Sequence, residues 1–180
     1  MKTLFTILAG MLISAGSFAQ NQWICSKGET SFFSETPVEN IAAVNKNVVS
    51  IIDFSTGQVA VKMNVAAFKF KNHLMEEHFN ENYMETEKYP VATFSGKMQG
   101  NADPAKNGTY DITATGQLTM HGVSRERTLK GRLIVNGNEI TLLADFDVAL
   151  KDHKIDVPTL VIAKIAENIA VKNKFVFSRK

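Results

Sequence analysis

The sequence predicts an all-β protein: a closed antiparallel barrel of about eight strands with one short helix inserted near residues 72–84. Three observations lead to this prediction. Apolar and polar residues alternate through most of the chain, Gly-, Pro- and Asn-containing turns separate the alternating segments, and a single segment has helical periodicity. A two-sheet sandwich would also account for the strands. The lone helix favours the barrel, because its apolar stripe could cover an open end.

The first 19 residues have the composition of a secretory signal peptide. Lys2 precedes an apolar run from Leu4 to Ile13, and the small residues Ser17 and Ala19 stand where signal peptidase reads the chain. We expect a signal peptide over residues 1–19 and one barrel domain over residues 20–180, located in the periplasm or secreted. The apolar run is too short to favour a membrane span, so no stable membrane insertion is expected.

Charge and cysteine content narrow the possible partners. Without Lys2 the formal net charge falls from +2 to +1, and no basic run could follow a phosphate backbone. Nucleic acid is therefore not expected as a partner. Cys25 is the only cysteine, so the core and not a disulfide must hold the fold together, and we expect a buried, inert thiol.

Residues 22–70 alternate in short runs that are typical of strands with one buried face. Val59, Val61, Met63 and Val65 share one face. A turn at residues 53–57 precedes them, so this region predicts a hairpin.

The segment 72–84 is the only convincing helix. Met75, Phe79 and Tyr83 recur at every fourth position and form an apolar stripe. We expect this stripe to close one end of the barrel. Three glutamates are expected to face water on the other side: Glu76, Glu77 and Glu81.

Four further alternating segments, at residues 91–98, 110–120, 129–135 and 140–150, predict successive antiparallel strands, and residues 169–177 predict a final strand. In the region 152–166, the run from Leu160 to Ile165 could be either a strand or a helical turn. Small inward residues are expected to leave room inside the barrel: Ala114, Gly116, Gly131 and Ala144.

Several motifs resemble one known family. They are Glu77-His78-Phe79-Asn80 through Lys88-Tyr89-Pro90, then Thr93-Phe94, and then the run from Gly116 to Val123 with the sequence G-Q-L-T-M-H-G-V. Together they look like the signature of the YceI-like, polyisoprenoid-binding domain family, and the resemblance spans most of the chain after residue 19.

The resemblance implies a lipocalin-like barrel, exported to the periplasm, with a long apolar tunnel for an isoprenoid chain. We therefore expect a non-enzymatic protein that sequesters or carries a long-chain apolar lipid, such as an isoprenoid or isoprenoid quinone, without a cofactor or metal. The residues expected to line the tunnel are Phe79, Tyr83, Phe94, Met98, Leu118, Leu133 and Phe146.

Two alternatives remain open. One is a small extracytoplasmic enzyme or metal protein that uses His78 or His121 with nearby carboxylates. The histidines lack a tight ligand spacing, and His73 and His78 would lie about 140° apart around a helix, so structural roles are favoured. The other alternative is a filled barrel whose exterior binds another envelope protein.

Overall fold

The computed structural model describes residues 22–157 and 165–179, and its sheet in these ranges has ten antiparallel strands. The strands are β1 (Gln22–Glu35), β2 (Asn40–Asn45), β3 (Val48–Asp53), β4 (Gln58–Asn64), β5 (Lys69–Phe70), β6 (Val91–Gln99), β7 (Gly108–Met120), β8 (Val123–Asn136), β9 (Glu139–Ala149) and β10 (Asn168–Arg179). The helical segments are η1 (Val65–Ala67), α1 (His73–His78), η2 (Phe79–Tyr83) and η3 (Leu150–His153).

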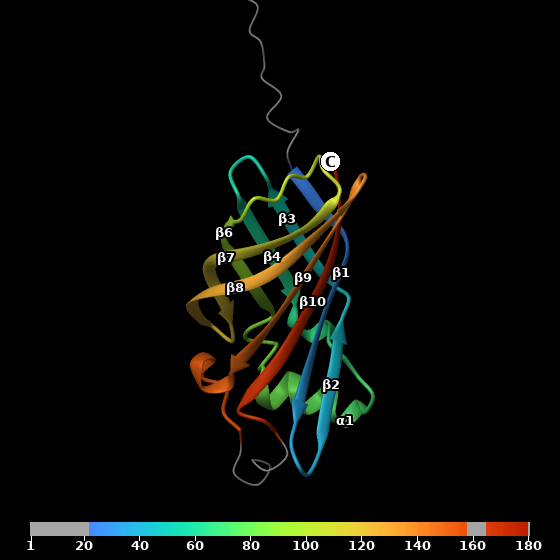
Figure 1. Ribbon diagram of the computed structural model, residues 1–180. Coiled ribbons are helices and arrows are strands. Elements are labelled where there is room, and N and C mark those ends of the chain that lie inside the picture. Colours follow the sequence, from blue (N-terminus) through green and yellow to red (C-terminus); the bar gives the residue numbers. More distant parts are fainter. Residues whose placement is uncertain (1–21, 158–164, 180) are drawn as a thin grey trace, which may run out of the picture.

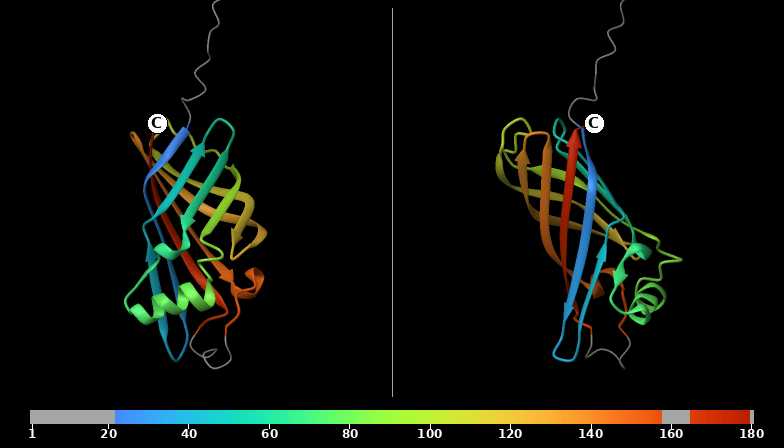
Figure 2. Two further views of the ribbon diagram at one scale, coloured as in Figure 1. Left: turned by 180° about the vertical axis from the view of Figure 1, so that it is seen from behind. Right: turned by 90° about the vertical axis from the view of Figure 1, so that its right-hand side faces the viewer.

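Eight of these strands close into a barrel, which confirms the predicted fold class (Figures 1 and 2). The strand order is β10-β9-β8-β7-β6-β4-β3-β1, and β1 pairs with β10 to complete the circle. Strands β2 and β5 continue the sheet beside the second half of β1. The predicted hairpin at residues 53–57 joins β3 to β4.

Strand β1 changes partner along its length. Its first residues pair with β3, and its last six pair with β2, with a register shift against β10 between Cys25 and Lys27. Cys25 lies at this irregularity and is half-buried, and burial raises the pKa of its thiol. A raised pKa favours the protonated, less reactive thiol. The thiol is only half-buried, however, and not buried as the sequence predicted.

One end of the barrel is closed by packed side chains. Trp23, Ile52, Leu133, Ile140 and Phe177 are each at most 4% exposed and belong to one core cluster. Burial of this kind is the main stabilising contribution in a barrel without disulfides, and truncating a buried Phe to Ala typically costs about 3–5 kcal/mol.

The helix lies at the opposite end of the barrel (Figure 2). It begins after Asn72, whose side chain accepts a hydrogen bond from the Leu74 amide. After His78 the chain continues as the π-helical turn η2, in which the Met84 amide donates to the Phe79 carbonyl oxygen at 2.8 Å. The predicted helix is therefore present, but its second half is π-helical, a geometry found mostly as single turns and often at functional sites.

Glu76 does not simply face water as expected. Its carboxylate accepts a hydrogen bond from Lys69 Nζ at 2.6 Å and another from the Phe70 amide at 3.3 Å. These bonds, chiefly the one from Lys69, lower the pKa of Glu76. The residue ties the helix to β5.

Gly96 and Gly116 allow β6 and β7 to approach closely. A Cβ atom on Gly116 would lie 2.2 Å from the Ser95 carbonyl oxygen and 2.3 Å from Gly96 Cα, so only glycine fits there. The prediction that Gly116 leaves room inside is wrong, because the backbone of β6 occupies that space.

The region after β9 begins with the 3₁₀ turn η3, and Lys154 follows in a left-handed conformation with φ of 55°. Most of the run from Leu160 to Ile165, where a strand and a helical turn were both possible, lies outside the described residues. No helix in residues 22–157 and 165–179 combines the length and the apolar character needed to cross a membrane.

Candidate ligand-binding cavity

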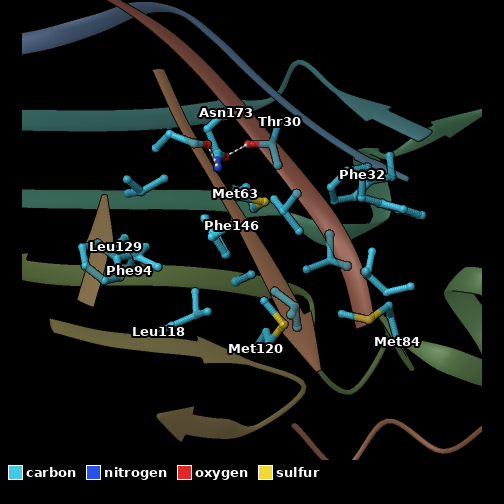
Figure 3. A pocket seen from close by; sticks show the side chains of 18 of the residues that line it. Thr30, Phe32, Met63, Met84, Phe94, Leu118, Met120, Leu129, Phe146 and Asn173 are labelled. Carbon is cyan, nitrogen blue, oxygen red and sulfur yellow. Dashed lines mark hydrogen bonds between the residues drawn. The ribbon is translucent and has the colours of Figure 1, made fainter. Parts of the chain in front are cut away.

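The barrel encloses an apolar cavity of about 460 Å³ between the packed end and the helix (Figure 3). All eight barrel strands contribute to its wall, and most of the lining side chains are aliphatic or aromatic. Its volume lies in the range of pockets that hold one small organic molecule. A wall of this composition can therefore remove much of an apolar ligand's surface from water.

Six of the seven residues predicted to line a tunnel lie on this wall: Phe79, Tyr83, Phe94, Met98, Leu118 and Phe146. Leu133 lies instead in the packed core at the closed end, where it is fully buried. Alternation identifies the inward face of β8 but not the height along the barrel at which a residue lies. Ligand contact by these residues stays a prediction.

Small residues contribute to the cavity wall. Ala114 of β7, Gly131 of β8 and Ala144 of β9 all line it, as the sequence predicted for these three positions. Because they carry little or no side chain, they leave volume that larger inward residues would fill.

An aromatic cluster holds the helix against the barrel. The Phe79 ring lies 5.6 Å from Phe32, 5.6 Å from Phe68 and 5.1 Å from Phe70, measured between centroids. Such distances are typical of favourable aromatic pairs. Tyr83, one turn later, is half-buried on the cavity wall, and burial raises the pKa of its hydroxyl. The segment α1–η2, called the lid below, thus covers the cavity with its apolar face, as expected.

Strands β8 and β9 separate beside the cavity. They pair only over residues 132–136 of β8 and then diverge (Figure 1). Two arginine side chains of β8 reach across this gap. Arg127 Nη2 donates to the Asp147 carbonyl oxygen of β9 at 2.8 Å, and Arg125 Nε donates to the Asp152 carbonyl oxygen of η3 at 3.0 Å. Side chains replace backbone hydrogen bonds on this part of the wall.

Two buried polar side chains interrupt the apolar wall. Thr30 of β1 and Asn173 of β10 are register partners, and the Thr30 hydroxyl donates to Asn173 Oδ1 at 2.8 Å (Figure 3). Asn173 Nδ2 donates to the Ala144 carbonyl oxygen at 3.1 Å. Both residues line the cavity.

Sequence reasoning missed this pair. The alternation of β10 is defined by its apolar inward residues, which are Ile169, Val171, Phe175 and Phe177. Asn173 occupies the one inward position between Val171 and Phe175. A polar residue in the inward phase of an otherwise apolar strand was the signal that could have identified it.

His121 is part of the structural support below the lid. It follows β7 in a two-residue turn with Gly122, with φ of 49° and 70° respectively. Its Nδ1 lies 3.0 Å from the His153 carbonyl oxygen and its Nε2 lies 3.0 Å from Glu85 Oε2. Because a carbonyl oxygen can only accept, Nδ1 carries a proton. Both ring nitrogens therefore have protein partners.

Tyr89 packs on this turn. Its ring lies 4.6 Å from the His121 ring between centroids, and a Cβ on Gly122 would lie 2.6 Å from Tyr89 Cε1. The two sequence motifs around Tyr89 and around His121-Gly122, more than 30 residues apart, thus form a single contact. This contact fixes the chain where it leaves the lid and re-enters the sheet.

His153 is fully buried in η3. Its Nδ1 donates to the Val123 carbonyl oxygen at 3.2 Å, whereas Nε2 has no hydrogen-bond partner among the described residues. Burial lowers the pKa of His153, with the Val123 carbonyl acting in the opposite direction. The side chain is therefore held neutral inside the fold.

The remaining histidines lie on the helix. His73 is exposed beside Glu77, with 3.2 Å between Nδ1 and Oε1, and the exposed His78 reaches the rim of the cavity. Across residues 22–157 and 165–179, no group of three or more His, Cys, Asp or Glu side chains could hold a metal ion.

A closed antiparallel barrel around one apolar cavity, with a helix over the mouth, defines a class of small-ligand-binding barrels. Within that class the chain belongs to the YceI-like domain family, which matches residues 27–177. The family resemblance noted in the sequence is thereby confirmed. None of the curated proteins compared with the chain matches it.

Solved structures share this fold. A polyisoprenoid binding domain from Saccharophagus degradans, implicated in plant cell wall breakdown, is 12% identical with a TM-score of 0.75, covering 89% of this chain and 99% of that one. Burkholderia cenocepacia BcnA is 17% identical with a TM-score of 0.70, covering 83% and 95% respectively. A Campylobacter jejuni YCEI protein is 19% identical with a TM-score of 0.61, covering 76% and 83%. At these identities the likeness is one of fold.

Proposed function

We propose that the protein is an exported, non-enzymatic carrier or store for a long apolar molecule of isoprenoid type, which it holds inside the barrel. The observation that carries this proposal is the apolar cavity of about 460 Å³ beneath an aromatic-anchored lid. Family membership and the naming of one structural neighbour as a polyisoprenoid binding domain support the ligand class. Residues 1–19, with the composition of a signal peptide, support export.

The cavity wall suits a ligand whose binding is driven by burial. Each CH₂ group removed from water contributes about 0.8 kcal/mol, so a chain needs few polar contacts to bind well. An engineered cavity of about 150 Å³ accepts benzene, with its six carbons, so about 460 Å³ corresponds to roughly 18 carbon atoms. Three or four isoprene units would fit inside, and a longer chain would extend through the mouth.

The two alternatives are less well supported. The enzyme or metal hypothesis relied on His78 or His121, and the ring nitrogens of His121 already face a backbone carbonyl and Glu85. The filled-scaffold hypothesis requires a packed interior, whereas only the end of the barrel around Phe177 and Leu133 is packed to that degree.

Organic extraction of the purified protein, followed by mass spectrometry, tests the proposal. We expect a co-purifying apolar chain, or stoichiometric uptake of an isoprenoid quinone or polyprenol analogue by delipidated protein. A protein that is lipid-free on isolation and takes up none of these analogues would contradict the carrier function. Fractionation of the host cell, followed by immunoblotting, tests export separately.

A further inference from the structure

Thr30 and Asn173 form a polar spot on an otherwise mostly apolar wall (Figure 3). Thr30 is 2% exposed and Asn173 is 7% exposed, and the side chains around them that line the cavity include Phe32, Phe146 and Phe175. Placing an amide and a hydroxyl in such surroundings has a free-energy cost unless their hydrogen bonds are made. The bonds made within the protein therefore decide what the pair can do.

The Asn173 amide has an unambiguous orientation. The Ala144 carbonyl oxygen only accepts, so the atom 3.1 Å from it is the NH₂ group, and the atom that accepts from Thr30 is the carbonyl oxygen. These two bonds use one of the two N–H donors and one of the two lone pairs of the amide. The Thr30 hydroxyl uses its only donor and keeps its acceptor sites.

The pair thus keeps one N–H donor and several acceptor sites beyond these two bonds. Ala144, directly opposite Asn173 in register, carries only a methyl group, so volume is left beside the amide. A ligand group that both donates and accepts at one atom, which is the chemistry of a hydroxyl, matches this arrangement.

We propose that Thr30 and Asn173 form a hydrogen-bonding subsite for the hydroxyl group of an uncharged isoprenoid alcohol, with the apolar chain lying along the rest of the cavity. This inference rests on the proposed function and adds the chemistry of the ligand's polar group and the place where it binds. Asn173 is the principal binding residue, because its amide both donates and accepts, and Thr30 orients the amide.

The surroundings favour an uncharged group over a carboxylate or phosphate. Among the described lining residues the only Lys, Arg, Asp or Glu side chains are those of Glu39 and Lys130, and Lys130 is exposed while Glu39 lies beside the β1–β2 turn. An anion beside Asn173 would lose its hydration without gaining a buried counter-charge. A hydroxyl group loses far less.

A purely structural role makes a different prediction. The pair joins β1 to β10 where the barrel closes, and Asn173 also pairs with the Ala144 carbonyl of β9, so the two side chains could serve only to fix the strand register. In that case their removal would lower stability and change the binding of every ligand alike. The presence of a subsite would change the preference between ligands.

The experiment compares two C15 ligands, farnesol and farnesene, which share an isoprenoid skeleton and differ in the hydroxyl group. Their dissociation constants are measured by displacement of a fluorescent apolar probe from delipidated wild-type protein and from the Thr30→Val/Asn173→Leu double variant. The ratio of the two affinities is compared between proteins, so the different water solubilities of the ligands cancel. Urea unfolding monitors the fold, and Ser34→Ala removes another buried hydroxyl on the wall as a control.

We expect the affinity for farnesol relative to farnesene to fall about tenfold in the double variant and to change less than twofold in Ser34→Ala. Thr30→Val alone leaves the Asn173 amide in place and should keep the preference for farnesol. This single variant supplies the test if the double variant fails to fold. Loss of the preference in Thr30→Val would overturn the principal role of Asn173.

An unchanged ratio in a folded double variant would overturn the subsite while leaving the carrier function intact. The subsite is likewise refuted if the wild-type protein binds both ligands and the ratio of the two affinities is the same in the wild type and in every variant. Failure of the wild-type protein to bind either ligand would contradict the proposed function itself.

Discussion

Replacing Phe79 by alanine should loosen the lid. The Phe79 ring contacts three other rings, those of Phe32, Phe68 and Phe70, with centroids between 5.1 and 5.6 Å away. Each aromatic pair contributes about 0.5–1.5 kcal/mol beyond area burial, so the three together correspond to about 1.5–4.5 kcal/mol. Because Phe79 is only half-buried, we expect the free energy of unfolding to fall by about 2–3 kcal/mol.

The matched control is Phe33→Ala. Phe33 follows Phe32 on β1 but points outward and is 39% exposed, so its loss should change stability by less than about 1 kcal/mol. Urea unfolding gives the free energies of both variants, and hydrogen exchange of the Met84 amide, which donates to the Phe79 carbonyl, reports the opening of the lid. Equal destabilisation by the two variants, or unchanged exchange at Met84 in Phe79→Ala, would refute the assignment of Phe79 as the lid anchor.

Three further predictions concern other parts of the fold. Gly122→Ala should lower the free energy of unfolding by more than about 1 kcal/mol, because φ is 70° and the new methyl group would meet Tyr89. The control is Gly137→Ala, where φ is 60° but no atom lies near the new methyl group, so the loss of stability should be smaller. Thermal melting compares the two variants. Burial lowers the pKa of His153, so as the pH falls the unfolded chain protonates this side chain before the folded protein does, and the free energy of unfolding should fall below about pH 6.5. Urea titrations at pH 7.5 and 5.5 should show a smaller loss of stability between the two pH values in His153→Gln than in the wild type. An equal loss in both proteins would show that His153 is not the cause. Ala144→Leu should fill part of the cavity and reduce probe uptake with the fold intact by circular dichroism, and undiminished uptake would place the ligand elsewhere.

The fold was predictable from sequence because its signals are local. Alternation fixes which side chains of a strand face inward, and it placed Phe94, Leu118 and Phe146 on the interior face where the structure has them. The lid was identified by the spacing of Met75, Phe79 and Tyr83, which also line the cavity.

Other features depend on contacts between distant segments and had no local signal. The closure of the barrel pairs β1 with β10, some 150 residues apart, and the height of Leu133 along the barrel follows from register and not from alternation. The hydrogen bonds of the His121 ring are made with Glu85 and with the His153 carbonyl oxygen, and these partners lie near His121 only in the folded chain. Alternation shows Asn173 as inward-facing, but its partner Thr30 is fixed by the closing register.

The divergence of β8 and β9 gives the barrel wall uneven mechanical properties. Where β7 pairs with β8 along the whole strand, widening the wall would break a continuous ladder of backbone hydrogen bonds. Beyond residues 132–136 of β8, widening the gap would break the hydrogen bonds that Arg127 donates to β9 and Arg125 donates to η3. Guanidinium groups released in this way can bond to water at little cost, since both arginines lie on the surface. This seam is therefore more compliant than the β7–β8 pairing, so the volume of the interior can adjust to a ligand without breaking the backbone hydrogen bonds between β7 and β8.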